Sequence, residues 1–179
     1  ACFKMILQEL KRLISDYRNG KPLLPNPEIV EAIGHILLDK KIDPDFKSLM
    51  LQFPGDGILA QEEEILDAKA FDQANQTLTK AFVQKYEKDI TELYHFHHNL
   101  DSSGDRALKN HLLFLLVDAN VPNSTSMAFE QFNSAKNMTE KINAIVALCK
   151  TDSKEKQKAL DEFLERWKED SVVYNKWLQ

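Results

Sequence analysis

The sequence has few residues that end secondary structure, with five glycines and six prolines among 179 residues. Few turn-forming residues favour long helices over many short strands. The alternation of apolar and polar residues that marks half-buried strands is also nearly absent. We therefore predict an all-α protein without a sheet.

Long apolar runs and excess positive charge are also missing. No run approaches the roughly 18 apolar residues of a membrane-spanning helix, and the net charge is −5. Nucleic-acid binding rests on a basic surface, so we expect neither nucleic acid nor membrane as a partner. Residues 1–5 show no charged segment followed by an apolar one, so we expect no signal peptide and a cytoplasmic protein.

Cysteine is scarce, since Cys2 and Cys149 are the two cysteines of the chain. Both fall on apolar helical stripes and lie far apart in the sequence. We expect buried free thiols in a reducing compartment, with a disulfide as the alternative.

Composition and length are those of a soluble globular domain. Hydrophobic residues make up 43% of the chain and charged residues 28%, which is ordinary for such proteins. A chain of this size buries roughly 70% of the surface that its unfolded form exposes. We expect one helical domain over residues 1–179 with a core of its own.

Apolar residues at intervals of three and four predict about eight antiparallel helices. Their expected positions are residues 3–17, 26–37, 44–50, a short and then a long helix within 61–98, 107–117, 139–149, 152–167, and a last helix from Asp170. Residues 53–57, 99–104 and 121–124 are predicted loops. The irregular lengths exclude a consensus TPR or ankyrin array and leave an irregular stack of helix pairs of the ARM/HEAT type.

Helix starts are marked by residues that can cap them. Asn26 precedes Pro27 and Asp43 precedes Pro44, a pattern typical of an N-cap followed by the first helical residue. The other predicted N-caps are Thr139, with Met138 packing on the first turn, and Asp152.

One cluster of candidate metal ligands stands out, at Glu92, His95, His97 and His98. The i, i+3 spacing of Glu92 and His95 occurs in di-iron bundles, which need two such motifs and two more glutamates. Zinc needs three or four ligands, and only the fold could add His35 or His111. Because His97 falls on the apolar stripe and its neighbours face elsewhere, we favour histidines at a solvated helix end.

The run Glu62, Glu63 and Glu64 is a candidate acid pair or cation site. Consecutive helical residues point about 100° apart, so these carboxylates do not converge. We instead expect them in the first turn of a helix, where they offset its dipole.

Motifs of other chemistries are absent. There is no phosphate-binding glycine loop, no Gly-x-Ser-x-Gly sequence and no cysteine nucleophile signature. We therefore predict no catalytic, cofactor-binding or metal-ligating residues in this chain.

Several stretches resemble a known family. Three of them are similar to motifs in the C-terminal helical domain of the M1 zinc aminopeptidases of the aminopeptidase N type. The motif F-x-x-A-x-N-M-T-D/E is matched by residues 132–140 (Phe-Asn-Ser-Ala-Lys-Asn-Met-Thr-Glu). The motif F-x-x-x-W is matched by residues 163–167 (Phe-Leu-Glu-Arg-Trp), and the motif D-K-W-F-x-x-Q resembles residues 175–179 (Asn-Lys-Trp-Leu-Gln). Residues 38–44, 51–57 and 106–110 resemble further motifs in the same order. Departures are Asn175 for aspartate, Leu178 for phenylalanine, Ala68 for proline and Asn75 near a usual arginine.

The resemblance implies a parent enzyme of several domains. In that family the zinc ligands of a His-Glu-x-x-His motif lie upstream in a thermolysin-like domain, and this chain has no such motif. The chain is then a truncated, non-catalytic part that holds no cofactor and limits access to the zinc site of the parent. Its expected partners are the catalytic domain of the parent and peptide substrates; the alternatives are a free-standing HEAT-like interaction module and a bundle with its own metal chemistry.

The end of the chain is unusually apolar for a final helical turn. Val172, Val173, Trp177 and Leu178 form one stripe, which we expect to be an exposed edge that further helices cover in the parent. Self-association of the isolated chain is the expected consequence.

Overall fold

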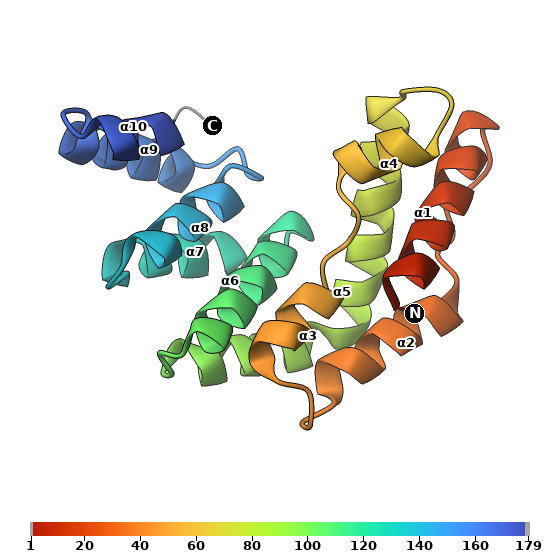
Figure 1. Ribbon diagram of the computed structural model, residues 1–179, viewed down its shortest axis with the longest axis horizontal. Coiled ribbons are helices and arrows are strands. Elements are labelled where there is room, and N and C mark those ends of the chain that lie inside the picture. Colours follow the sequence, from red (N-terminus) through yellow and green to blue (C-terminus); the bar gives the residue numbers. More distant parts are fainter. Residues whose placement is uncertain (1, 178–179) are drawn as a thin grey trace.

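The computed structural model describes residues 2–177, with the backbone alone for Lys176 and Trp177. These residues form ten helices and no strand (Figure 1): α1 (Cys2–Arg18), α2 (Pro27–Leu38), α3 (Pro44–Met50), α4 (Asp56–Glu62), α5 (Ala68–His98), α6 (Ser103–Asp118), α7 (Ser124–Ser134), α8 (Met138–Leu148), α9 (Lys154–Trp167) and α10 (Ser171–Trp177). The prediction of an all-α stack is confirmed, with ten helices where about eight were expected.

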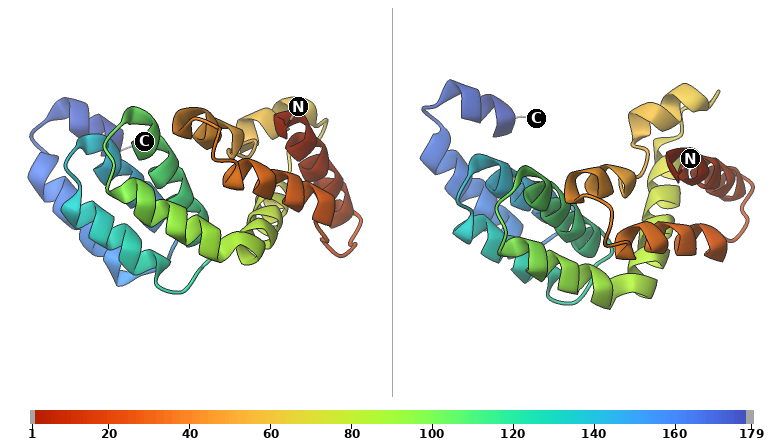
Figure 2. Two further views of the ribbon diagram at one scale, coloured as in Figure 1. Left: turned by 90° about the horizontal axis from the view of Figure 1, so that it is seen from below. Right: turned by 60° about the horizontal axis from the view of Figure 1, so that its bottom comes forward.

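The helices follow a curved path through space. Both views in Figure 2 show α1 at one end of an arc and α9 with α10 at the other. Helices α1 and α2 pack on α5, α3 packs on α6, and the pairs α5–α6, α7–α8 and α9–α10 are neighbours in the stack. Neighbouring helices joined by short loops give the irregular paired arrangement predicted from the sequence.

A bend divides α5 into two parts. Tyr86 has non-helical angles of φ −120° and ψ 21° inside this helix. Its ring packs on Phe82, with 5.6 Å between the ring centroids, and lies against Gly34 of α2. A Cβ atom at Gly34 would stand 2.1 Å from Cζ of Tyr86, so the absence of a side chain allows α2 to approach the bend.

The core is one continuous apolar cluster. Helix α6 buries Leu108, Leu112, Leu115 and Leu116, as its apolar pattern predicts. Full burial of one such side chain contributes about 1.5–3 kcal/mol. The largest fully buried side chains elsewhere are Phe82, Phe132, Ile6, Leu10, Leu13, Ile14, Ile33, Leu37, Leu51, Leu59, Leu78 and Ile90.

Three predicted helix starts are confirmed. Oδ1 of Asn26 accepts a hydrogen bond from N of Glu28 at 2.9 Å, and Asp43 caps α3 in the same way. Asp170 accepts from the first amides of α10, at 3.0 Å from N of Val172. Each cap satisfies an amide that has no partner inside its helix.

Two predicted N-caps were wrong. Helix α8 is capped by Asn137, whose Oδ1 accepts from N of Glu140 at 2.9 Å, while Thr139 is an exposed residue inside the helix. Helix α9 is capped by Ser153 and not by Asp152. In both cases a neighbouring residue adopts the extended backbone angles from which its oxygen reaches the third amide of the helix.

The glutamate run does not lie in a first turn, so that prediction was wrong. Helix α4 begins at Asp56, inside the predicted loop. Gly55 is its N-cap, and the negative charge of Asp56 in the first turn is favourable at the N-terminal end of the helix dipole. Glu62 is therefore the last residue of α4, and Glu63 follows it. Glu63 instead pairs with Arg18 of α1, with 2.6 Å between Oε2 and Nη1.

Helix α7 was not predicted. Its sequence is rich in serine, threonine and asparagine, which have low helix propensity, and it follows the predicted loop at 121–124. Its buried face consists of Ser124, Ala128, Gln131 and Phe132. Because most residues on that face are small or polar, the sequence lacks the apolar residues at intervals of three and four that would predict a helix.

Neither cysteine is fully buried, which corrects the expectation. Both are free thiols; Cys149 is exposed and Cys2 half-buried. Cys149 follows the last residue of α8. The buried stripe of the helix therefore ends before it.

The apolar stripe at the end of the chain is described in part. Val172 is 70% exposed, and Val173 packs partly against the core. Leu178 lies outside the described residues, as does the side chain of Trp177, so the predicted self-association stays a prediction. Among the described helices, none is long and apolar enough to cross a membrane.

Candidate functional site

The histidine cluster points in different directions. His97 is buried, and its Nδ1 lies 2.6 Å from Oδ1 of Asp105 at the start of α6. His95 and His98 are exposed. Within residues 2–177, no three or more histidine, cysteine or carboxylate side chains are placed to hold a metal ion.

Three residues at the start of α6 and the end of α5 are of the types found in a catalytic triad, but their spatial arrangement differs from that of a triad. They are Ser102, Asp105 and His97. Oγ of Ser102 donates to Asp105, which also holds His97, so the carboxylate stands between the other two. In a triad the histidine stands between and removes the proton of the serine. Here Ser102 and Asp105 form the capping box of α6, and His97 fastens α5 to it. Burial alone raises the pKa of Asp105, but the hydrogen bonds from Ser102 and His97 hold that pKa below its ordinary value.

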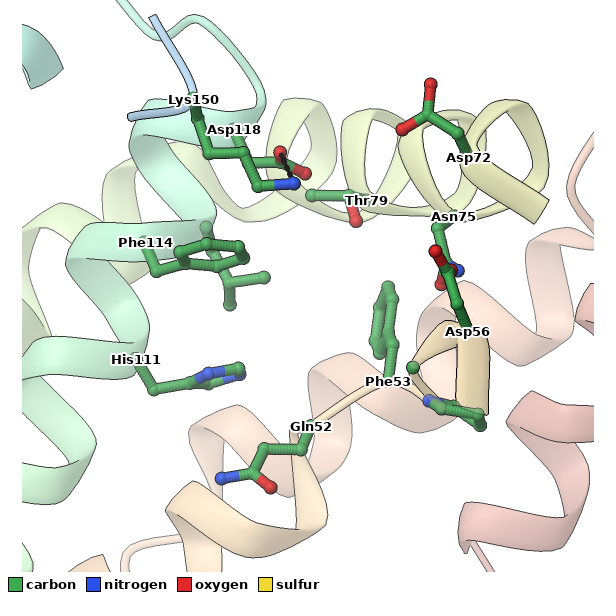
Figure 3. Close-up of a pocket in the computed structure, with 13 residues that line it drawn as sticks. Gln52, Phe53, Asp56, Asp72, Asn75, Thr79, His111, Phe114, Asp118 and Lys150 are labelled. Atoms are coloured by element: carbon green, nitrogen blue, oxygen red, sulfur yellow. Dashed lines mark ion pairs between the residues drawn. The ribbon is translucent and has the colours of Figure 1, made fainter. Parts of the chain in front are cut away.

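A cavity of about 380 Å³ opens between α5 and α6, and we call it the α5–α6 cavity (Figure 3). It is lined by Gln52, Phe53, Pro54, Gly55, Asp56, Asp72, Asn75, Thr79, His111, Phe114, Leu115, Asp118 and Lys150. On α6 the lining residues recur at intervals of three and four, and on α5 they follow the same rule. One face of each helix therefore forms a wall, and the loop before α4 closes a third side.

An ion pair stands on the α6 wall. Nζ of Lys150, just beyond α8, lies 3.2 Å from Oδ1 of Asp118 and 5.3 Å from the ring centroid of Phe114 (Figure 3). A carboxylate and an aromatic face together form a favourable environment for a cation. The lysine belongs to the segment that follows α8, so the chain beyond α8 also contributes to this cavity.

His111 holds the loop that closes the cavity. Its Nε2 lies 3.1 Å from the carbonyl oxygen of Leu51, which requires Nε2 to carry the proton and donate it. Burial lowers the pKa of His111, which favours the neutral ring. The imidazole thus has a structural partner next to the loop that supplies Phe53 and leads into α4 at Asp56.

Thr79 is the most deeply buried polar residue of the cavity wall. It is 4% exposed, and its hydroxyl forms no hydrogen bond within the described residues. Figure 3 shows this hydroxyl pointing into the cavity. Among the described lining residues none is a serine or cysteine, so the arrangement is suited to binding and offers no nucleophile of those types.

A second groove, of about 740 Å³, lies between α2–α3 and the later part of α5. Lys47 lies in its wall, buried, and Nζ donates to the carbonyl oxygen of Leu37 at 2.8 Å. Burial lowers the pKa of Lys47. The ammonium group also satisfies a carbonyl at the C-terminal end of α2, where a cation is favoured.

A buried polar network joins two of the sequence motifs. Lys109 lies in the motif at 106–110 and pairs with Glu140 of the motif at 132–140. Nε2 of Gln131 donates to Oδ1 of Asn110 at 2.8 Å, and the Tyr94 hydroxyl donates to Gln131 at 3.3 Å. Burial raises the pKa of Tyr94 well above its ordinary value. The motif residues therefore fasten α6 to α7 and α8, which is a role in the scaffold.

Comparison with known families identifies the chain. Residues 1–179 match the family model described as "Domain of unknown function (DUF3458_C) ARM repeats". The chain belongs to this family. The ARM repeats in that description agree with the stack of helix pairs in Figure 1.

Curated relatives carry the name aminopeptidase N. The protein of Escherichia coli (strain K12) is 22% identical over 183 residues, covering 99% of this chain and 21% of its own length. That of Haemophilus influenzae is 24% identical over 179 residues, covering 97% and 20%. That of Caulobacter vibrioides is 26% identical over 155 residues, covering 82% and 18%. The chain thus spans about a fifth of the length of the relatives it matches, and the resemblance read from the motifs is confirmed.

A solved structure shares the fold. The crystal structure of Legionella pneumophila aminopeptidase A in complex with aspartic acid superposes with a TM-score of 0.83 at 21% identity. It covers 96% of this chain, which takes up 22% of that protein. The likeness extends over nearly every helix of the stack.

Sequence reasoning did not find the α5–α6 cavity. Its lining residues come from positions between Gln52 and Lys150, and the helical spacing within α5 and within α6 does not show that these two faces and the loop at 52–56 meet. The motif at 51–57 was the one available signal, since residues 52–56 close one side. The histidine and glutamate clusters that the sequence did single out contribute no residue to this cavity.

Proposed function

We propose that this chain is a non-catalytic helical segment of a larger zinc-dependent aminopeptidase of the aminopeptidase N type, which removes N-terminal amino acids from peptides. The observation that carries the proposal is the unequal coverage: the E. coli relative aligns with 99% of this chain but over 21% of its own length. About four-fifths of such an enzyme thus has no counterpart here. The chain then corresponds to one part of a longer polypeptide.

In this proposal the zinc ion is held by the remaining part of the enzyme. A catalytic zinc site takes three protein ligands and keeps one position open for water, which the metal activates for hydrolysis. The sequence contains no His-Glu-x-x-His motif. We propose that the chain supplies no zinc ligand and no catalytic residue.

The proposed role of the helical stack is to cover the active site and restrict access to it. The curved path of the helices in Figure 2 is suited to embracing a neighbouring domain. Large exposed apolar side chains on α2, α3 and α5 also support a contact surface, since such patches usually mark interaction sites; they are Leu38, Phe46, Leu49 and Phe96. The partners are then the catalytic part of the polypeptide and its peptide substrates. The chain itself forms a single helical domain. We place it in the cytoplasm, where free thiols such as Cys2 and Cys149 persist.

The first experiment measures hydrolysis of aminoacyl anilides by the purified chain, with and without added zinc. The host strain lacks its own aminopeptidase N, so that contamination does not contribute. We expect no turnover. Zinc-dependent turnover that disappears when His95 and His98 are replaced by alanine would contradict the proposal and favour a bundle with its own metal chemistry.

The second experiment tests the covering role in a polypeptide that carries both this chain and a His-Glu-x-x-His domain. Its rates on a small anilide and on a 30-residue peptide (a length chosen for bulk) are compared with those of a version lacking residues 1–179. We expect the deletion to raise the rate on the long peptide relative to the anilide. An unchanged ratio, or stable expression of the chain with no catalytic partner in its native host, supports the free-standing HEAT-like module instead.

A further inference from the structure

We propose that the α5–α6 cavity binds an organic cation, an ammonium or guanidinium group carried by a lysine or arginine side chain of a peptide. The cation site itself is argued from the geometry of the cavity. The choice of a peptide as the carrier rests on the proposed function.

Lys150 shows the chemistry that the cavity recognises. Its ammonium group already lies between the carboxylate of Asp118 at 3.2 Å and the ring face of Phe114 at 5.3 Å. This combination of an anion and an aromatic face is how proteins bind ammonium and guanidinium groups. Lys150 therefore occupies the position that a ligand cation takes.

The lysine can leave this position while the carboxylate stays. The side chain of Lys150 is 43% exposed and that of Asp118 is 11% exposed. An ion pair with one solvent-exposed partner contributes little to stability, and Lys150 lies beyond the end of α8 with a long flexible side chain. A ligand cation can replace it with a small change in free energy, because the charge on Asp118 stays neutralised.

Thr79 supplies an independent sign of a ligand. The side chain of Thr79 is 4% exposed, and its hydroxyl has no protein partner among the described residues while it points into the cavity (Figure 3). The hydroxyl is thus open to the cavity and available to a ligand. It can donate to a peptide carbonyl or accept from an ammonium group. A bound peptide offers both groups.

The remaining charges of the cavity favour a cation over an anion. Asp56 and Asp72 line it as well, and neither forms an ion pair within the described residues. Burial lowers the pKa of His111, so the imidazole adds no positive charge near neutral pH. Once Lys150 has moved out, Asp118 and Asp56 remain as negative charges on the cavity wall, while the carboxylate of Asp72 points away from it (Figure 3). The volume of about 380 Å³ is at the small end of ligand sites and suits one side chain with its adjoining peptide units.

The test titrates the ¹⁵N-labelled chain with three capped tripeptides, acetyl-Ala-X-Ala-amide with X lysine, norleucine or glutamate, and follows amide shifts and calorimetric heat. n-Butylammonium serves as an organic cation that carries no peptide. We expect the lysine peptide to bind and the norleucine and glutamate peptides not to bind. Lys150→Met should tighten binding of the lysine peptide by about fivefold, the factor that one partly exposed ion pair corresponds to.

Further variants separate the contributions. Asp118→Asn should weaken binding by about tenfold because a charge-assisted hydrogen bond is lost, and Thr79→Val should weaken it by about threefold. Phe114→Leu replaces the aromatic face if Asp118→Asn fails to fold. Lys156→Met is the matched control, since Lys156 of α9 pairs with the exposed Asp152 away from the cavity, and the substitution should leave binding unchanged.

Each other outcome decides against part of the proposal. Equal binding of the lysine and norleucine peptides, or no effect of Lys150→Met and Asp118→Asn, overturns the cation site. Binding of n-butylammonium without the lysine peptide overturns the peptide as the carrier. Hydrolysis of anilides by the chain alone overturns the proposed function and leaves the cation site intact, so the two failures are distinguishable.

Discussion

Lys109 of α6 and Glu140 of α8 form an ion pair inside the helical stack, with 2.8 Å between Nζ and Oε1. Their side chains are 3% and 9% exposed. A buried pair is a weak source of net stability, because both charges lose their hydration, but removing one partner leaves the other charge uncompensated. Replacing either residue alone is therefore expected to destabilise the fold, because the remaining charge stays buried without its partner.

Lys109→Met should destabilise the chain by about 3 kcal/mol or more, because the Glu140 carboxylate is left buried without its cation. The double variant Lys109→Met/Glu140→Leu should be more stable than Lys109→Met alone, since no unpaired charge remains. Urea unfolding followed by circular dichroism measures both. Additive effects of the two single substitutions would show that the pair is not coupled.

Acidification should weaken the fold through the same carboxylate. Burial by itself raises the pKa of Glu140, but the hydrogen bond and positive charge of Lys109 outweigh it and hold that pKa below its ordinary value of 4.5. A carboxylate with a lowered folded pKa stabilises the fold above its unfolded pKa, and this contribution is lost as pH falls through the folded pKa.

We therefore expect the difference in melting temperature between the wild-type chain and Glu140→Gln to be largest near neutral pH and to shrink steadily below pH 4.5. Thermal melts between pH 7 and 3 measure it. Glu64→Gln is the control, because that glutamate is exposed, and its difference should stay near zero throughout. A Glu140→Gln difference that is independent of pH contradicts the assignment.

Gly104→Ala should destabilise the chain by about 1–3 kcal/mol, a typical penalty for overpacking. A Cβ atom at Gly104 would lie 2.8 Å from the backbone nitrogen of Asp45, so α6 and α3 must move apart. Gly57→Ala is a matched control, since it is likewise the second residue of its helix and its Cβ would meet nothing within 4 Å. Chemical denaturation should show Gly57→Ala unchanged or slightly stabilised; equal effects of the two substitutions would rule out the close approach.

Asn137→Ala should destabilise the chain by about 1 kcal/mol, the usual effect of removing an N-cap. Thr139→Ala should change stability by less than about 0.5 kcal/mol, because its side chain is exposed and makes no hydrogen bond within the described residues. Melting temperatures of the two variants, measured together, decide between the two candidates. A larger loss for Thr139→Ala would return the cap to the position first expected from the sequence.

Local signals predicted much of the fold because they act within one helical turn. Asn26 and Asp43 cap the helices they were expected to cap, and Asp170 caps the helix that was expected to start at it, since the side-chain oxygen and the amide it accepts from are two or three residues apart. The same range explains the errors at Thr139 and Asp152. Two neighbouring residues can both act as a cap, and backbone angles set by the surrounding fold choose between them.

The sequence by itself determined the helical class, most helix starts and the family, because these depend on periodicity, capping and ordered motifs along the chain. Only the tertiary structure decided which polar residues are buried together and where the cavity lies. Lys109 and Glu140 are 31 residues apart, and the cavity joins side chains from Gln52 to Lys150. Contacts at such separations depend on how the helices pack, and local propensity contains no information about that packing.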